Sequence, residues 1–167
     1  AKELGRTTSF SAIQVSEGME NLASAGFEAN EIYAAMPGLL NLAASDNIDL
    51  ASASEIAAGA LRGFGLEASQ TGHVADVLAE SAARTNASVS SMGTALSYIA
   101  PVSKAMGISM EETAAAVGLL SNANITGTKA GTSLRGALSR LAKPSEKAAE
   151  AMEMLGFNAY DSQGNMK

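Results

Sequence analysis

The sequence contains no cysteine and no tryptophan among its 167 residues, and it has only three tyrosines and four phenylalanines. The absence of cysteine excludes disulfide bonds, thiolate metal ligands and a cysteine nucleophile. Hydrophobic residues still make up 47% of the chain, and alanine supplies much of that fraction. Because alanine is the strongest helix former and fills little volume, the composition predicts an all-α protein with a thin core and close helix–helix contacts.

Basic residues are also scarce, since 11 Lys and Arg stand against 17 Asp and Glu, for a net charge of −6. Proteins that bind nucleic acid usually present a basic face to the phosphates. The Lys and Arg residues are scattered along this sequence, so we predict no direct nucleic-acid binding. No apolar run approaches the roughly 18 residues of a membrane span, and none is predicted.

The two ends of the sequence carry little pattern. Residues 1–9 have no apolar signal region and no initiator methionine. Asp161-Ser-Gln-Gly164 suits a hairpin turn, with a short strand beginning after Tyr160. We therefore expect a piece of a longer polypeptide, divided into a lead segment (1–9), a helical core domain (10–157) and a C-terminal turn or strand start (158–167).

One pattern recurs through the chain: a polar residue opens a helix, Ala and Leu follow at spacings of three and four, and a Gly-apolar pair closes it. Glycine adopts the left-handed conformation without a Cβ clash, and the apolar residue after it folds back onto the last helical turn. The predicted helix ends of this kind are Gly26-Phe27, Gly65-Leu66, Gly107-Ile108 and Gly156-Phe157, with Asn124-Ile125 as an asparagine version.

The same pattern predicts where helices begin. The residues expected to cap the first amide groups are Ser11, Asn30, Asp49, Ser88 and Ser109, and Ser109-Met-Glu-Glu112 has the spacing of a capping box. Further helices are predicted over residues 69–84, 130–142 and 145–155. Pro37 and Pro101 fall inside helical patterns, where we expect a break or kink.

Together these elements predict an all-α fold, a compact bundle of about seven or eight short Ala-rich helices. The first three Gly-apolar pairs recur at intervals of about 40 residues, which is the length of helix-pair repeats. A solenoid of such repeats is the alternative arrangement. The bundle is preferred because the helices between the glycine stops differ in length and in side-chain pattern.

Residues 126–133, Thr-Gly-Thr-Lys-Ala-Gly-Thr-Ser, raise the question of a phosphate-binding loop, since amide groups at a helix N-terminus bind anions. The phosphate motif needs a glycine, four residues and then Gly-Lys-Ser/Thr. Here Lys129 precedes Gly131, and no strand leads into the loop. We interpret the segment as a structural loop that caps the next helix.

The ionisable residues form no convincing reaction centre. His73 is the only histidine, and Asp76 and Glu80 share its helical face, but a metal or catalytic site needs more convergent partners. Glu111 and Glu112 form an acidic pair that could do acid–base work, as in glycosidases. Both lie in the first turn of a predicted helix, where the dipole favours negative charge, so capping is the preferred interpretation. We predict no catalytic, cofactor-binding or metal-binding residues and no cofactor.

The sequence contains eight methionines. Methionine fills irregular gaps in cores, and it also lines promiscuous binding grooves. Core filling is the preferred role for most of them, with a Met-rich partner surface as the alternative. The residues concerned include Met19, Met36, Met92, Met106, Met110, Met152 and Met154.

Several short stretches follow one another in a characteristic order, at residues 17–27, 39–44, 60–66, 74–79, 107–114, 118–135 and 154–157, with 161–165 after them. Taken together, they resemble the core region of phage tail tape measure proteins. No stretch is specific alone, whereas their order and spacing over residues 10–167 are. The strongest is Gly-Leu-Leu-Ser-Asn-Ala-Asn-Ile-Thr-Gly-Thr-Lys-Ala-Gly-Thr-Ser-Leu-Arg at 118–135, where Asn124 departs from the glycine more usual in the family.

The resemblance implies a structural, non-enzymatic protein of a phage or prophage tail. Family members are long and largely helical, occupy the lumen of the tail tube, set tail length during assembly and are associated with genome delivery. The implied location is the virion tail, with the host cytoplasm during assembly. The implied partners are other copies of the chain, the tail tube protein, tail assembly chaperones and tail-tip proteins.

The composition suggests how such a segment would work, as a hypothesis. An acidic chain in a narrow tube is repelled by DNA and leaves ahead of it. Ala-rich helices bury little apolar area, so they unravel at modest cost. The alternative function is a helical protein-binding module, such as a chaperone or regulatory docking domain, recognised by an exposed apolar groove. A hydrolase comes third, because no nucleophile–base pair is apparent.

Overall fold

The computed structural model describes residues 1–160 and confirms the all-α class. The β-hairpin turn expected at Asp161–Gly164 lies outside the described residues. The predicted helices correspond to α2–α9, and α1 adds a short helix within residues 1–9. In order, the elements of residues 1–160 are α1 (Lys2–Thr7), α2 (Ala12–Ser24), α3 (Ala29–Ser45), α4 (Leu50–Phe64), the 3-10 turn η1 (Ala68–Gln70), α5 (Thr71–Arg84), α6 (Val89–Ala105), α7 (Met110–Asn122), α8 (Gly127–Ala142) and α9 (Glu146–Met154).

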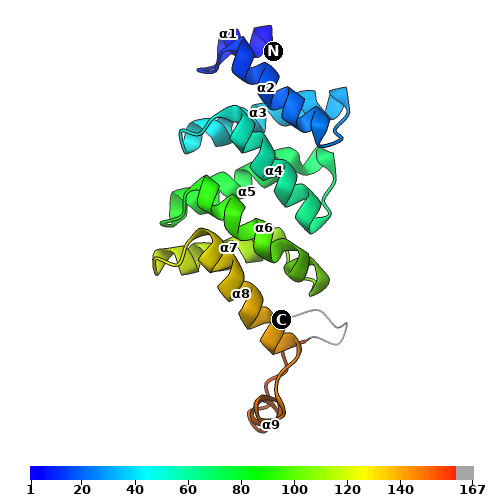
Figure 1. The fold of residues 1–167 in the computed structure, drawn as a ribbon, viewed down its shortest axis with the longest axis vertical. Helices are drawn as coiled ribbons and strands as arrows, with labels where there is room; N and C mark the ends of the chain where they lie inside the picture. The colour runs from blue at the N-terminus through cyan, green and yellow to red at the C-terminus, as the bar shows by residue number, and fades with distance from the viewer. Residues whose placement is uncertain (161–167) are drawn as a thin grey trace.

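The helices stack in two layers along one long axis (Figure 1). The even layer contains α2, α4, α6 and α8, and the odd layer contains α3, α5 and α7. Each helix packs mainly against the next helix and the next but one, and the most extensive contacts join α6 to α8 and α4 to α6. The bundle is therefore elongated, and its unit is a helix pair, as in the repeat arrangement that the 40-residue spacing indicated.

The core is a continuous strip of apolar side chains that runs along the stack. Alanines without solvent exposure, such as Ala53, Ala57 and Ala114, lie among larger side chains and keep the helices close. A single helix pair cannot bury such a strip, so each pair depends on its neighbours for burial. The largest side chains fully buried in it are Val15, Leu22, Met36, Leu39, Leu42, Leu50, Val74, Leu78, Val89, Met92, Leu96 and Ile99.

Most of the methionines fill the core as predicted. Met36 and Met92 are fully buried, and Met106 and Met110 are buried. The prediction is wrong for Met154, whose side chain is 82% exposed. The reason is that Met154 ends α9, which lies beyond the end of the stack and has no helix packed over it (Figure 1).

The predicted helix starts are confirmed with one exception. The side chains of Ser11, Asp49, Ser88 and Ser109 each accept a hydrogen bond from the backbone amide three residues later. The prediction that Asn30 caps α3 is wrong, because the N-cap residue of this helix is Glu28. The carboxylate of Glu31 accepts a hydrogen bond of 2.8 Å from the amide of Glu28, and Asn30 lies within the first turn.

The glycine and asparagine stops are confirmed, and a further one appears at Asn47. All of the stop residues have positive φ angles, including Asn47 at 50° and Asn124 at 60°. At each stop the amide of the following apolar residue donates to the carbonyl five residues before it, which is the Schellman arrangement. These bonds run from Phe27 to Leu22, Ile48 to Ala43, Leu66 to Leu61, Ile108 to Ser103, Ile125 to Leu120 and Phe157 to Met152.

The breaks expected at the two internal prolines are absent. Pro37 lies within the uninterrupted helix α3, and Pro101 lies within α6. Each proline removes the amide that would bond to the carbonyl four residues earlier, at Tyr33 and Ser97. All four residues are exposed, so water can hydrogen-bond to the freed carbonyl groups and the helix continues.

Glycines inside helices mark where next-but-one helices approach most closely. A Cβ added to Gly131 of α8 would lie 2.4 Å from the carbonyl oxygen of Ala95 in α6. A Cβ added to Gly38 of α3 would lie 3.1 Å from the Cα of Gly72 in α5. Gly131 in particular leaves no room for a side chain, so the tightest contact between α6 and α8 requires glycine there.

We expect Asp49→Ala to lower the free energy of unfolding by about 1 kcal/mol at neutral pH, since the N-cap of α4 is lost. The carboxylate of Asp49 accepts bonds of 2.7 Å from the amide and the hydroxyl of Ser52. The amide bond from Ser52, followed by the hydroxyl bond, lowers the pKa of Asp49. Because its pKa is lower in the folded state, the Asp49 carboxylate stabilises the fold at pH values above its pKa in the unfolded chain. This stabilisation is lost as the pH falls below about 4.

Urea denaturation at neutral and acidic pH measures this effect. Asp49→Asn is the matched control, because asparagine also caps well but does not titrate. The advantage of wild type over Asp49→Ala should shrink in acid, whereas that of Asp49→Asn should stay constant. Equal stability of wild type and Asp49→Ala at neutral pH would show that this cap does not stabilise α4.

Candidate functional site

The phosphate-loop candidate is the N-terminal turn of α8. Gly127 has a φ angle of +54°, and Lys129 is exposed. Gly131 is buried, and a Cβ on it would meet Ala95 and Tyr98 of α6. Gly131 therefore serves the close approach of two helices. The interpretation of residues 126–133 as a structural loop is wrong, because residues 127–133 form the first turns of α8 and only Thr126 precedes the helix.

The structure brings His73 to a partner that the sequence did not indicate. Its Nε2 atom lies 2.5 Å from Oε1 of Glu111, so the pair connects α5 to α7 in the odd layer. Both side chains are about half exposed, with 52% and 51% of their surfaces open to solvent. Exposed ion pairs of this kind contribute little to stability.

The other acidic candidates have separate local roles. Glu80 pairs with Arg84 one helical turn away, and neither Asp76 nor Glu80 joins His73. Glu112 accepts a hydrogen bond of 2.9 Å from the amide of Ser109, as the capping interpretation predicts. Across residues 1–160 no three His, Cys, Asp or Glu side chains gather where they could hold a metal ion.

The pKa of Glu111 and that of Glu112 both lie below their ordinary values. For Glu111 the main cause is a hydrogen bond to its own backbone amide, and the second is His73. For Glu112 the main cause is the hydrogen bond to the amide of Ser109. Both carboxyl groups are therefore held as anions, which suits capping and does not suit a general acid.

Two surface hollows are candidate ligand sites. One of about 450 Å³ lies between the end of α8 and α9 and is lined mainly by apolar side chains such as Leu141, Met152 and Phe157. The other, of about 260 Å³, lies beside His73 and Glu111. Neither hollow brings a nucleophile, a base and an oxyanion-binding group together in the described part of the chain.

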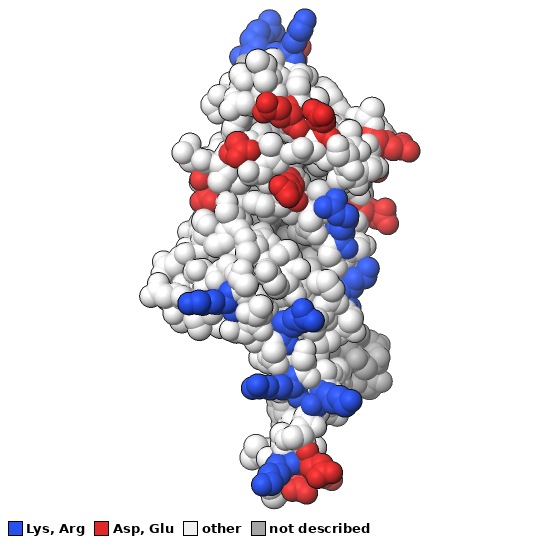
Figure 2. All heavy atoms as spheres, viewed as in Figure 1, with Lys and Arg blue, Asp and Glu red and all other residues white. Residues whose placement is uncertain are grey.

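Charge is segregated along the even layer (Figure 2). Acidic side chains lie over α2 and the first part of α4, and basic side chains lie over α8. Basic side chains also lie over α1 at the N-terminal end, and acidic side chains lie beside basic ones over α9. α2 carries Glu17 and Glu20 without any Lys or Arg, and α8 carries Lys129, Arg135 and Arg140 without any Asp or Glu. The basic residues of α8 lie at one end of this layer, whereas Arg62 and Lys104 lie in α4 and α6.

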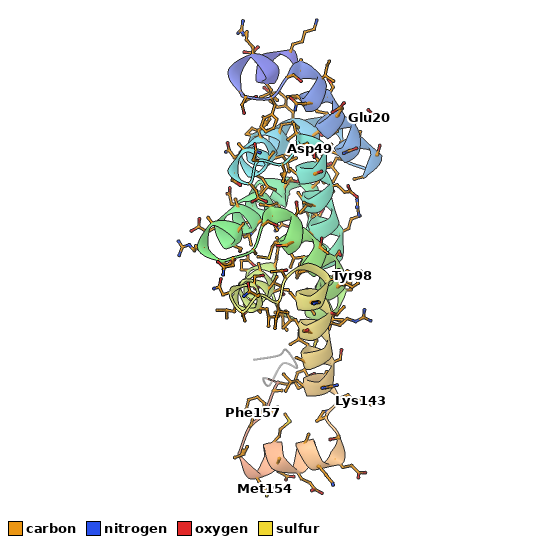
Figure 3. All side chains as sticks on the ribbon, turned by 60° about the vertical axis from the view of Figure 1, so that its left-hand side comes forward. Glu20, Asp49, Tyr98, Lys143, Met154 and Phe157 are labelled. Atoms are coloured by element: carbon orange, nitrogen blue, oxygen red, sulfur yellow. The ribbon has the colours of Figure 1, made fainter. Side chains whose placement is uncertain are left out.

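Few of these charges have a partner within the chain. Over residues 1–160 the ion pairs are Glu3–Arg6, His73–Glu111 and Glu80–Arg84, and none involves an acid of α2 or a base of α8. Figure 3 shows Glu20 and Lys143 on the same side of the stack, with Tyr98 between them. The charged side of the even layer is therefore open to an external partner.

Comparison with known proteins assigns the family. The family model described as phage-related minor tail protein matches residues 1–167, the whole of this sequence. The chain belongs to the phage-related minor tail protein family. The resemblance inferred from the order of short motifs is thus confirmed, although no solved structure matches the chain.

Two relatives within phages carry tape measure names. The tape measure protein of Pneumococcus phage Dp-1 is 56% identical over 166 residues, which is 99% of this chain and 14% of the relative. The probable tape measure protein of Escherichia phage P2 is 39% identical over 167 residues, which is 100% of this chain and 20% of the relative. The chain therefore spans a fifth or less of the relatives that it matches.

In the part of the chain that the structure describes, none of the helices combines the length and the apolar character needed to cross a bilayer. Exposed apolar side chains lie along the stack at Ile13, Tyr33 and Leu119, and others lie at the end of α8 and in or just after α9, at Leu141, Met154, Leu155 and Phe157.

Proposed function

We propose that this chain is a structural segment of a tape measure protein, which sets tail length during assembly and is linked to genome delivery. The observation that carries the proposal is the match of the whole chain to the phage-related minor tail protein family and to two phage proteins with tape measure names. The fold supports it, because a stack of helix pairs is a scaffold whose length grows with the number of pairs.

The proposal includes a location and partners. The segment acts in the virion tail and is present in the host cytoplasm during assembly. Its partners are other copies of itself, the tail tube protein, tail assembly chaperones and tail-tip proteins. The working unit is the core domain of residues 10–157.

We also propose that this segment has a structural and not a catalytic role. Its ionisable candidates support this, since Glu112 caps a helix and the His73–Glu111 pair is half exposed. The net charge of −6 supports release ahead of the genome, because like charges repel in a narrow tube.

The test is an in-frame deletion of residues 10–157 in the phage gene that contains them. We expect phages with normal heads but with absent or shortened tails, seen by electron microscopy of lysates. The control is Ile13→Ala, which changes a side chain that is 72% exposed and should leave tail length unchanged. Tails of normal length and number after the deletion would contradict the proposal and favour a protein-binding module without a measuring role.

A further inference from the structure

We infer that the outer side of α8 binds the phosphate backbone of DNA, without preference for base sequence. The surface is the side of this helix that carries Lys129, Arg135 and Arg140, continued by Lys143 at its C-terminal end. The inference does not depend on the proposed role in tail length, because it concerns what the chain binds on its own. It replaces the expectation of no direct nucleic-acid binding, which came from the net charge of the whole sequence.

The first support is that the surface around α8 is positive although the chain as a whole is acidic. Residues 113–145 contain four basic residues and no acidic residue, whereas the whole sequence has a net charge of −6. The neighbouring helix α6 also lacks Asp and Glu and carries Lys104. Figure 2 shows the basic side chains over α8 with no acidic side chain among them. A polyanion that approaches this end of the even layer therefore meets positive charge.

The second support is that three of the basic residues form a row along one side of α8. Lys129 and Arg140 lie about three helical turns apart, and Lys143 follows Arg140 by about one turn. Arg135 flanks this row, and all four side chains are exposed. At about 1.5 Å per residue the row is about 21 Å long, and this length matches about six base pairs of duplex at about 3.4 Å each.

The charges of α8 itself do not account for this row. The helix dipole favours positive charge in the last turn, where Arg140 lies, and disfavours it in the first turn, where Lys129 lies. The ion pairs of residues 1–160 include no basic residue of α8, so no acid of the described chain compensates for Lys129. An anion outside the chain supplies this compensation.

The chemistry of the same side favours a phosphate backbone over a protein or a membrane. The hydroxyl groups of Ser133 and Ser139 are exposed beside the basic row, and hydroxyl, Lys and Arg groups are common donors to phosphate oxygens. Gly136 lies in the row and faces open space, so a backbone can approach closely. The leucines of α8 recur on the opposite side, where Leu138 is buried. The basic side therefore lacks the large apolar anchors of protein interfaces and of membrane-surface helices.

The acidic end of the stack lies too far away to cancel this attraction. α4 and α6 stand between α8 and α2, which carries Glu17 and Glu20. Packed helices are about 8–10 Å apart, so these acids lie roughly 25–30 Å from α8. That separation is well beyond the Debye length of about 8 Å at physiological salt. Repulsion of DNA by the acidic end and binding of DNA by α8 are therefore compatible.

The experiment is fluorescence anisotropy of a labelled duplex of about 20 base pairs, titrated with the 167-residue chain at about 25 to 150 mM salt. Four phosphate contacts predict a slope of about −3.6 for the logarithm of the association constant against the logarithm of the salt concentration. We expect a dissociation constant on the order of 10 μM at about 100 mM salt, equal for two unrelated duplex sequences.

Two variants remove half of the basic side chains each. Lys129→Gln/Arg140→Gln and Arg135→Gln/Lys143→Gln should each raise the dissociation constant at least about tenfold at about 100 mM salt. Each should also make the salt slope shallower by about 2, because two phosphate contacts are lost. Circular dichroism of each variant verifies that the helices are intact.

A matched control removes two basic residues from the other end of the stack. Lys2→Gln/Arg6→Gln changes the net charge by the same amount as each α8 variant, at exposed positions in α1. This variant should bind the duplex with the affinity and the salt slope of wild type. A loss as large as that of the α8 variants would assign the binding to net charge and not to the side of α8.

Three further results would overturn the inference. One is a wild-type chain that does not bind the duplex at about 25 mM salt. Another is binding that both α8 variants leave unchanged. The last is tighter binding to polyglutamate or to phosphatidylglycerol vesicles than to the duplex, which would assign the basic side to an acidic protein or to a membrane surface.

Discussion

Replacing Gly131 with valine is expected to lower the free energy of unfolding by about 3 kcal/mol, the upper end of the range of about 1–3 kcal/mol that overpacking a tight contact typically costs. A Cβ at this position would lie 2.4 Å from the backbone oxygen of Ala95 and 2.9 Å from the Cβ of Tyr98. A backbone carbonyl cannot move aside as a flexible side chain can. The substitution therefore pushes α8 away from α6, the pair of helices with the most extensive contact.

The effect of Gly131→Val should be local as well as large. α8 is the last helix of the even layer, so its separation leaves the pairs before it in contact with one another. Hydrogen exchange in α8 should therefore accelerate on the order of 100-fold, while exchange in α2–α4 stays near the wild-type rate. The measurements are urea denaturation and native-state hydrogen exchange.

The same substitution five residues later is the matched control. Gly136 lies in the same helix and faces open space. Because valine has a slightly higher helix propensity than glycine, Gly136→Val should change stability by less than about 0.5 kcal/mol. If the two variants lose stability equally, then the loss reflects valine in a helix, and the close contact with Ala95 is not what holds α8.

Replacing Ile99 with alanine is expected to lower the free energy of unfolding by about 3 kcal/mol, through lost burial and a cavity. Ile99 is fully buried in α6, which packs against α4, α5, α7 and α8. A cavity in this helix weakens the contacts on both sides of it. In contrast to Gly131→Val, exchange should therefore accelerate from α4 to α8.

Ile13→Ala serves as the control for Ile99→Ala, since it removes the same atoms from a side chain that is 72% exposed. Exposed positions of this kind usually change stability by about 0.5 kcal/mol or less. Thermal denaturation followed by circular dichroism compares the two variants. A destabilisation of Ile99→Ala no larger than that of Ile13→Ala would mean that α6 is not part of a packed core.

The features that the sequence predicted best depend on residues close together in the chain. A cap such as Ser88 acts on an amide three residues away, and a stop such as Gly65 lets the amide of Leu66 bond to the carbonyl of Leu61, five residues earlier. Both are therefore visible in a short window of sequence. Asn47 acts in the same way, and Asn47-Ile48 has the same form as the predicted stop at Asn124-Ile125.

The features that could not be predicted depend on how the helices pack. His73 and Glu111 are far apart in the sequence, and they meet only because α5 and α7 are next-but-one neighbours in the odd layer. The continuity of α3 through Pro37 depends on exposure, which periodicity alone did not reveal.

The structure implies that each helix pair is held by its neighbours alone, and pulling on the two ends of the chain tests this most directly. In an optical trap we predict several successive unfolding events at low force, each releasing roughly 40 residues or about 140 Å of extended chain. Such stepwise release would suit a segment that must pass through a narrow tube. A single event at high force that releases the whole chain at once would contradict the account.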